Sequence, residues 1–399
     1  MHRAFFTSIS SNYLDKALAL AESIFENYPD GHFYISVLNF RLLSKHALTH
    51  FNLIKDGYET KGNFLYFIDP LLLYREPDNL VYKFSMIEAC TAIKPAVAQK
   101  LLERYQHVTY FDPDIIVFNP LPEDKVLGDS WDFQVTPHIL SPPIQAGKLS
   151  ERLFLNFGVF NLGYFSVRDT LSSKQFLEWW KLFCINCCVI SPQLGLFVDQ
   201  KAVDLVGCFV DRLSILRNPG CNVAWWNLFC DGRVVLKDQK ISYRSNVEKL
   251  YFFHFSNLDN SSDEKSRLIS KPLDSFHNLT SSGTEKTVAT NPAMLEIFED
   301  YRERLDRMQI PEITNELSFN TTYKKVRIRG FVRTTFLEAN LRGMKNIHSP
   351  FNRPQILVFI SCFVHIVRTT KGTDIRLFLK FIKQLIDSML HLSLAKFES

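Results

Sequence analysis

The 399-residue chain has no long uninterrupted apolar stretch. A helix needs about 20 mainly apolar residues to cross a bilayer, and no run here approaches ~18, so we predict no spanning helix. Residues 1–17 also lack the apolar core of about 7–15 residues that marks a secretory signal, and we therefore expect a cytoplasmic protein. No long segment is of low complexity, so the composition is that of a globular chain.

Cysteine is sparse, with eight residues in the whole chain, and only Cys184, Cys187 and Cys188 lie close together. A zinc site of this kind would need a second cluster, and the sequence has none. The three residues follow Trp179-Trp180 in an apolar segment. We therefore expect reduced thiols packed in the core.

Charge is distributed unevenly along the chain, although its net value is only +4. Residues 324–399 hold 14 Lys and Arg against 4 Asp and Glu, which leaves 32 basic against 38 acidic residues elsewhere. The tail therefore carries +10 and the remainder −6. We expect no nucleic-acid partner for this chain.

The first 40 residues have the pattern of a βαβ unit. Residues 4–9 are β-prone, and residues 10–12 offer helix-capping side chains. Apolar residues then recur at helical spacing over residues 14–25, and residues 32–38 form a second β-prone run. A strand, helix and strand over so short a length predict a parallel sheet.

Several further elements are predicted from periodicity and breakers. We expect a helix over residues 84–102 with a break near Pro95, a loop over 123–141, and a strand pair over 153–167. A hairpin is expected at 234–236 and 241–243, and a helix at 293–308. An amphipathic basic helix is expected over 374–396.

Two aspartates, Asp112 and Asp114, follow the β-prone run of residues 107–111. Pro113 between them cannot donate to a sheet ladder, so regular pairing is expected to stop there. Hard divalent cations take carboxylate oxygens, and open α/β sheets bind ligands at the carboxyl ends of strands. The pair therefore predicts a site for a metal and a diphosphate, with a plain polar turn as the alternative.

Four features in this order resemble GT-A-fold nucleotide-sugar glycosyltransferases, in particular the retaining glycogenin-like group and bacterial cell-surface polysaccharide glycosyltransferases. The first is the strand-turn-helix that in the family contacts the nucleotide, here with Thr7, Ser8, Ser10, Asn12 and Tyr13. The second is the hydrophobic-Asp-x-Asp run at residues 110–114. The third joins residues 161–163 with Asp199-Gln200, and the fourth is the late histidine, His254.

The resemblance implies an α/β GT-A fold, Rossmann-like, with a mostly parallel central sheet flanked by helices and a mainly helical C-terminal extension. Residues 1–258 would form the GT-A-like domain, 259–292 a linker or surface loop, and 293–399 a basic, mainly helical region. The implied activity is metal-dependent transfer of a hexosyl group from a nucleotide-diphosphate sugar to a saccharide or lipid-linked acceptor, with retention, in polysaccharide biosynthesis.

The resemblance also implies a role for each site residue. Asp112, Asp114 and His254 would hold Mn²⁺ or Mg²⁺, and Asp112 would also contact the donor. Lys94 would pair with donor phosphate. The residues expected to act at the reacting sugar are Asp199, Gln200 and Asn161.

Each role has a structural alternative. His254 would be a core histidine, Asp199 a helix cap, Asn161 a turn residue, and Lys94 a solvated helix lysine. Trp225 and Trp226 would stack on acceptor sugar or pack in the core.

Two other functions compete with glycosyl transfer. A haloacid-dehalogenase-like phosphohydrolase also places Asp-x-Asp after a hydrophobic strand, but it would want the pair early in the chain. A non-catalytic relative that binds sugar or membrane is the other reading. The basic amphipathic helix at residues 374–396 suggests contact with anionic lipid, which would make the protein peripheral at the inner membrane face.

Overall fold

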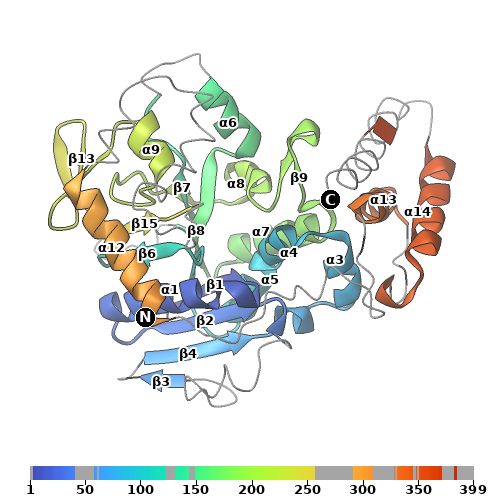
Figure 1. Cartoon of the computed structure of the whole chain (residues 1–399), viewed down its shortest axis with the longest axis horizontal. Coiled ribbons are helices and arrows are strands. Elements are labelled where there is room, and N and C mark those ends of the chain that lie inside the picture. Colours follow the sequence, from blue (N-terminus) through green and yellow to red (C-terminus); the bar gives the residue numbers. More distant parts are fainter. Residues whose placement is uncertain are drawn as a thin grey trace, which may run out of the picture.

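The structure is a computed structural model that describes residues 3–40, 58–60, 63–122, 131–142, 149–256, 291–308, 328, 330–344, 347, 350–370 and 382–383. Its centre is an eight-stranded sheet in the order β11-β7-β8-β5-β1-β2-β4-β3 (Figure 1). The first strands are β1 (Arg3–Ile9), β2 (His32–Val37), β4 (Asn63–Ile68) and β5 (His107–Phe111). These four are parallel neighbours, so the predicted mostly parallel α/β sheet is confirmed.

The other strands of the sheet include two antiparallel ones. Strand β8 (Phe160–Arg168) runs antiparallel to β5 and to β7 (Phe133–Pro137), and the edge strand β3 (Tyr58–Thr60) runs antiparallel to β4. Strand β11 (Leu213–Ile215) pairs in parallel with β7. The sheet is therefore mixed, with its reversals at β8 and β3.

The predicted βαβ unit is present. Helix α1 (Leu14–Asn27) joins β1 to β2, whose residues pair in register from Ala4 with His32 to Ile9 with Val37. Both faces of β1 are covered, because Phe5 and Phe6 point to opposite sides and are both fully buried. Phe6 belongs to the core under α5 and α7, and Phe5 to the core under α1.

Most helices that cover the sheet lie on the Phe6 side. The predicted break near Pro95 is confirmed, since α4 (Met86–Ala92) ends one residue before α5 (Lys94–Leu102) begins. Ser85 and Glu88 form a capping box at the start of α4. The other helices on this side are α3 (Pro77–Lys83), α7 (Leu171–Cys187) and α8 (Val206–Phe209). Helix α9 (Trp225–Cys230) instead packs through Leu228 in a separate core that includes Phe253.

Small sheets stand beside the central one. Strands β12 (Val234–Leu236), β13 (Lys240–Tyr243) and β14 (Asn246–Lys249) form an antiparallel meander that contains the predicted hairpin. Strand β15 (Phe252–His254) pairs antiparallel with β6 (Ile115–Val117). The last small sheet joins β9 (Ile190–Ser191) to β10 (Leu196–Phe197).

The C-terminal helices lie at two ends of the molecule (Figure 1). Helix α12 (Pro292–Arg307) crosses α1, where the Arg304 guanidinium lies 3.0 Å from Glu22 and 2.9 Å from Glu26. At the opposite end are α13 (Gly330–Leu341) and α14 (Gln355–Thr369). Val332, Phe336 and Val358 belong to the same buried core as Phe6, so this part of the tail packs on the sheet domain.

Two sequence predictions are wrong. Residues 153–167 are not a strand pair, because α6 (Leu149–Phe157) precedes the single strand β8. Gly158 ends α6 with φ +122°, which glycine tolerates because it has no Cβ, and its amide bonds to the Phe154 carbonyl. Residues 123–141 are not all loop, since β7 lies there and pairs with β8 and β11.

The buried Cys184 and Cys188 and the half-buried Cys187 are free thiols, as expected. Of the helices in the described ranges, none combines the length and hydropathy that a bilayer crossing requires. The basic helix predicted at 374–396 lies almost wholly outside the described residues, as does most of the linker at 259–292. The domain boundaries at 258 and 292 therefore stay predictions.

Candidate active site

The candidate site lies where the order of the sheet reverses. The chain passes from β1 to β2 and β4 on one side, and then returns to place β5 on the other side of β1. A crevice forms outside the carboxyl ends of strands at such a switch point, and ligands of open α/β sheets bind there. Asp112 directly follows β5, and the turn from Asp112 to Ile115 then leads into β6.

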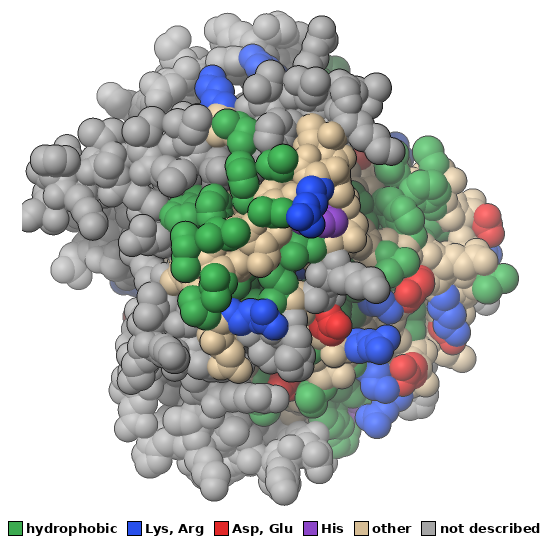
Figure 2. Space-filling model, turned by 90° about the vertical axis from the view of Figure 1, so that its right-hand side faces the viewer, with side chains coloured by type: hydrophobic (Ala, Val, Ile, Leu, Met, Phe, Trp, Pro, Cys, Tyr) green, Lys and Arg blue, Asp and Glu red, His purple; other side chains and the backbone are tan. Residues whose placement is uncertain are grey.

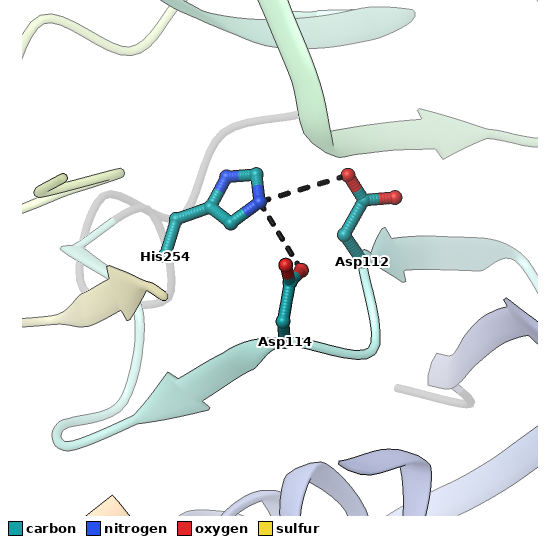
Figure 3. Close-up of side chains that lie close together, drawn as sticks. All are labelled: Asp112, Asp114 and His254. Atoms are coloured by element: carbon teal, nitrogen blue, oxygen red, sulfur yellow. Dashed lines mark ion pairs between the residues drawn. The ribbon is translucent and has the colours of Figure 1, made fainter. Parts of the chain in front are cut away.

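Strand pairing brings His254 to the aspartates from far along the chain. His254 lies opposite Ile115 in the β15–β6 ladder, and the Phe255 amide bonds to the Asp114 carbonyl at 2.8 Å. Its Nε2 atom is 3.2 Å from an Asp114 carboxylate oxygen and 3.8 Å from one of Asp112 (Figure 3). The ligand atoms of the three side chains all lie within 4.8 Å of one another.

This cluster suits a divalent cation. Bonds of about 2.1 Å put neighbouring ligand atoms about 3 Å apart, so the separations at His254 need little adjustment. Two carboxylates and one imidazole fit Mn²⁺ or Mg²⁺ better than a thiolate-seeking metal. Burial favours a neutral His254, but the Asp114 and Asp112 carboxylates outweigh it and raise its pKa. A metal ion would bind the neutral ring, so protonation of His254 would compete with metal binding.

Gly163 of β8 makes room for the histidine ring. A Cβ at this position would lie 2.6 Å from His254 Cε1 and 2.7 Å from its Nδ1. The Gly163 carbonyl also accepts a hydrogen bond of 2.8 Å from the Asp112 amide. Nδ1 of His254 has no hydrogen-bond partner among the described residues. The ring is oriented by the contact of Nε2 with Asp114, by packing against Gly163, and by the edge-to-face contact with Trp226, whose ring centre is 5.4 Å away.

Lys94, at the start of α5, is buried beneath the cluster. Its ammonium donates to Asp112 Oδ1 at 3.2 Å and to the Leu162 carbonyl at 3.3 Å, and it lies 3.2 Å from Asp199 Oδ2. Burial lowers its pKa, but the two carboxylates outweigh this and raise the pKa overall, so the lysine stays charged. A solvated helix lysine is excluded, and its partners here are carboxylates, where the resemblance implied a donor phosphate.

Asp199 is a buried carboxylate on the far side of Lys94. Burial raises its pKa to about 6, which Lys94 opposes and the Asp112 carboxylate adds to. Its Oδ2 atom makes no hydrogen bond, although the Lys94 ammonium is at ion-pair distance. Its backbone carbonyl accepts from the Trp180 indole at 3.1 Å. Asp199 is thus fixed in place by its backbone and by the ion pair with Lys94.

Gln200 and Asn161 are held against the backbone of β8. Gln200 accepts from the Leu162 amide at 2.9 Å and donates to the Phe157 carbonyl at 2.9 Å. Asn161 accepts from the Gly163 amide at 3.1 Å, and its Nδ2 lies 3.3 Å from His138 Nε2. Both side chains therefore shape the strand that carries Gly163, and Asn161 lies within β8 and is not a turn residue.

The five N-terminal candidates lie along the end of β1 and the turn that follows. Ser8 donates to the Cys90 carbonyl at 2.7 Å, and Ser10 donates to Asn12 at 2.5 Å. Thr7 is buried, and its hydroxyl has no hydrogen-bond partner. Burial raises the pKa of the half-exposed Tyr13 phenol, and the Asp114 carboxylate adds to this effect. The segment thus follows the carboxyl end of β1, the strand that pairs with β5.

Sequence reasoning missed two groups that contact the site. Tyr110 donates to Asp112 Oδ1 at 2.5 Å and also lies under Lys94, whose Nζ is 4.4 Å from the ring centre. His138 contacts Asn161 and the Trp226 ring. Tyr110, two residues before Asp112, was within the quoted motif and could have been found there; nothing in the sequence indicated His138.

A cavity of about 390 Å³ adjoins His138. Its walls come from the ends of β7, α6, β8 and β11, and they are mainly apolar. The lining includes His138, Leu140, Phe154, Phe160, Ile215 and Arg217. Trp226 is buried nearby and donates to the His138 carbonyl at 3.1 Å, so this tryptophan packs in the core.

No family model matches the chain. It is similar to two proteins of Bacillus subtilis (strain 168). YfnF, an uncharacterised protein, is 26% identical over 275 residues, which are 64% of this chain and 82% of YfnF. YfnD, also uncharacterised, is 21% identical over 260 residues, which are 63% of this chain and 76% of YfnD.

Solved structures similar to the chain are glycosyltransferases, the class that the sequence resemblance named. Galactosyltransferase LgtC, solved with donor and acceptor sugar analogues, has 16% identity and a TM-score of 0.39 and covers 72% of this chain and 99% of LgtC. Mouse xyloside xylosyltransferase 1 has 11% identity and a TM-score of 0.39, over 64% of this chain and 98% of that one. With TM-scores below 0.5, these likenesses do not by themselves support an inference of function.

Proposed function

We propose that this chain is a metal-dependent glycosyltransferase that moves a hexosyl group from a nucleotide-diphosphate sugar to a saccharide or lipid-linked acceptor. The observation that carries the proposal is the cluster of Asp112, Asp114 and His254 at the carboxyl end of β5. Its position at the switch point of the sheet, beside the turn after β1, is where a nucleotide would bind.

The three side chains would hold a divalent cation, which when bound supplies Lewis-acid stabilisation to the leaving diphosphate. Asp112 would also face the donor, since its side chain is 27% exposed although its oxygens contact Lys94 and His254. Lys94 would position the two carboxylates beside it. The residues that we assign to the nucleoside are Thr7, Ser8, Ser10, Asn12 and Tyr13.

Asp199 is the group that we assign to the sugar. It is buried, and it is fixed through its backbone and by the ion pair with Lys94. Such a carboxylate would bind a donor hydroxyl or stabilise positive charge that develops at the anomeric carbon. Gln200 and Asn161 would set the position of β8 against the sugar. Retention of the anomeric configuration is proposed from the sequence resemblance.

The cavity beside His138 is our candidate for the acceptor. One hydrogen bond links His138 to Asn161, so an acceptor in the cavity would end close to the proposed sugar site. Its apolar walls and Arg217 suit an acceptor that carries an apolar group and an anionic group, as a lipid-linked saccharide does. Work at the inner membrane face in polysaccharide biosynthesis would follow from such an acceptor.

A panel of nucleotide sugars, scored by thermal shift with and without Mn²⁺, tests the proposal. A ligand that binds only the folded state raises its stability by RT ln(1 + [L]/Kd), so the correct donor should raise the melting temperature only when metal is present. Hydrolysis of that donor should then be measured without acceptor. Binding without hydrolysis would favour a non-catalytic sugar-binding protein, and release of phosphate from simple phosphomonoesters would favour a phosphohydrolase.

A further inference from the structure

Helix α14 presents an apolar stripe to solvent. Its inward residues Val358, Cys362 and Ile366 are fully buried in the main core. The opposite face carries five apolar side chains at helical spacing, each about half exposed. They are Ile356 (58% exposed), Leu357 (54%), Ile360 (48%), Val364 (39%) and Val367 (49%). We call these five residues the α14 stripe.

Basic residues accompany the stripe. Arg353 and Arg368 are exposed near the two ends of α14. Between residues 330 and 370 the sequence has five Lys and Arg and one acidic residue, Glu338. That glutamate is neutralised by Arg342, whose Nε lies 2.6 Å from it. Figure 2 shows hydrophobic side chains gathered on the face of the molecule that carries α14, with Lys and Arg side chains beside them.

Two other partners for the stripe are the C-terminal segment of this chain and a second copy of it. Of the chain after residue 370, the structure describes residues 382 and 383, and Ile382 packs on the core, in the same cluster as the inward face of α14. A second copy would need about 800 Å² per partner, whereas five half-exposed aliphatic side chains offer on the order of 400 Å².

We propose that the α14 stripe is a lipid-contacting surface that lies in the interface of an anionic membrane. Its aliphatic side chains would enter the acyl boundary, while Arg353 and Arg368 reach the headgroups. Each basic residue near an anionic surface adds to the attraction, and salt screens it. This surface belongs to a helix packed on the sheet domain, and it is separate from the anchor predicted at residues 374–396. The inference stands independently of the proposed sugar transfer.

The test is cosedimentation of the full-length protein with vesicles. Vesicles of phosphatidylcholine with phosphatidylglycerol should bind it at low salt, and vesicles of phosphatidylcholine alone should bind it weakly. The double variant Ile360→Glu/Val367→Glu should lower the partition coefficient at least tenfold. The matched control is Val234→Glu/Val247→Glu, which adds the same charge at two exposed valines (46% and 58%) on β12 and β14.

Several outcomes would overturn the inference. They are failure of the unaltered protein to bind anionic vesicles, equal binding by the α14 double variant, and equal loss in the control. A dimer in light scattering that the α14 variant converts to a monomer would make the stripe a contact between copies. If the Glu variant unfolds, Ile360→Ser/Val367→Ser keeps the test open, with the same tenfold loss expected. Donor hydrolysis with Mn²⁺ in vesicle-free buffer should be unchanged in the α14 variants, so failure of the proposed enzyme activity and failure of this inference are read separately.

Discussion

The substitution Gly163→Ala should weaken divalent-metal binding with little change at the ligands themselves. The added Cβ would lie 2.6 Å from His254 Cε1, 2.7 Å from its Nδ1 and 2.8 Å from Asn161 Oδ1. An ordinary contact is about 3.5 Å or longer, so the ring must move by close to 1 Å. Because no hydrogen bond holds Nδ1, the ring is the side that gives way. The movement should carry Nε2 away from Asp112 and Asp114.

Loss of support around a metal ligand typically lowers metal affinity by about 10–100-fold, and we expect Gly163→Ala to fall in this range. Overpacking of the core should also cost about 1–3 kcal/mol in the free energy of unfolding. Titration calorimetry with Mn²⁺ measures the first effect, and denaturant unfolding of the metal-free protein measures the second. The matched control is Gly207→Ala in α8, where the new Cβ meets only Leu213 Cδ2 at 3.6 Å. Unchanged Mn²⁺ affinity in Gly163→Ala would refute the assignment of His254 as a ligand held by packing.

Four further predictions follow from the same contacts. Asp114→Asn should abolish Mn²⁺-dependent donor hydrolysis while the protein stays folded. If the unaltered protein hydrolyses the donor equally fast in EDTA and in Mn²⁺, the metal-ligand role of Asp114 is wrong. Asp199→Ala should lower kcat far more than donor affinity, because it removes a charge that matters mainly in the transition state, and a change confined to donor KM would make it a binding residue. Burial lowers the pKa of His138 to about 4, so its neutral ring should contribute full stability above pH ~6.5. The free energy of unfolding should then fall by about 3 kcal/mol as the pH drops toward ~4, and His138→Gln should reduce this dependence of the free energy of unfolding on pH. Arg333→Met should lower the free energy of unfolding in denaturant by about 2–4 kcal/mol, because Arg333 donates to the carbonyls of Val81, Tyr82 and Phe84 at the end of α3. An unchanged denaturation midpoint would show that water replaces the guanidinium.

The local features of the site were readable from the sequence because they depend on neighbouring residues. The βαβ start follows from alternation, capping and helical spacing within 40 residues. The place of Asp112 and Asp114 at a strand end follows from the proline between them, which cannot continue a sheet ladder. The break near Pro95 and the hairpin after Val234 are of the same kind.

Other local predictions failed where two structures fit the same short apolar run. Residues 149–157 mix apolar and polar side chains over only nine positions, a length at which helix and strand patterns are hard to separate. The positive φ of Gly158, which ends α6, is a backbone property that the residue type permits but does not require. The strand at Phe133–Pro137 is too short to stand out, and its pairing with β8 decides its conformation.

The partners of the charged groups were decided by tertiary structure alone. His254 reaches Asp114 because β15 pairs with β6, which are about 140 residues apart in the chain, and no local pattern encodes that register. Lys94 is buried between Asp112 and Asp199 because α5, β5 and the segment before Lys201 meet beneath the sheet edge. The sequence by itself thus determined that β1 leads into a helix and that two carboxylates follow the end of β5. Packing of distant elements decided which charges face one another, since ion pairs act through space and their distances depend on the whole fold.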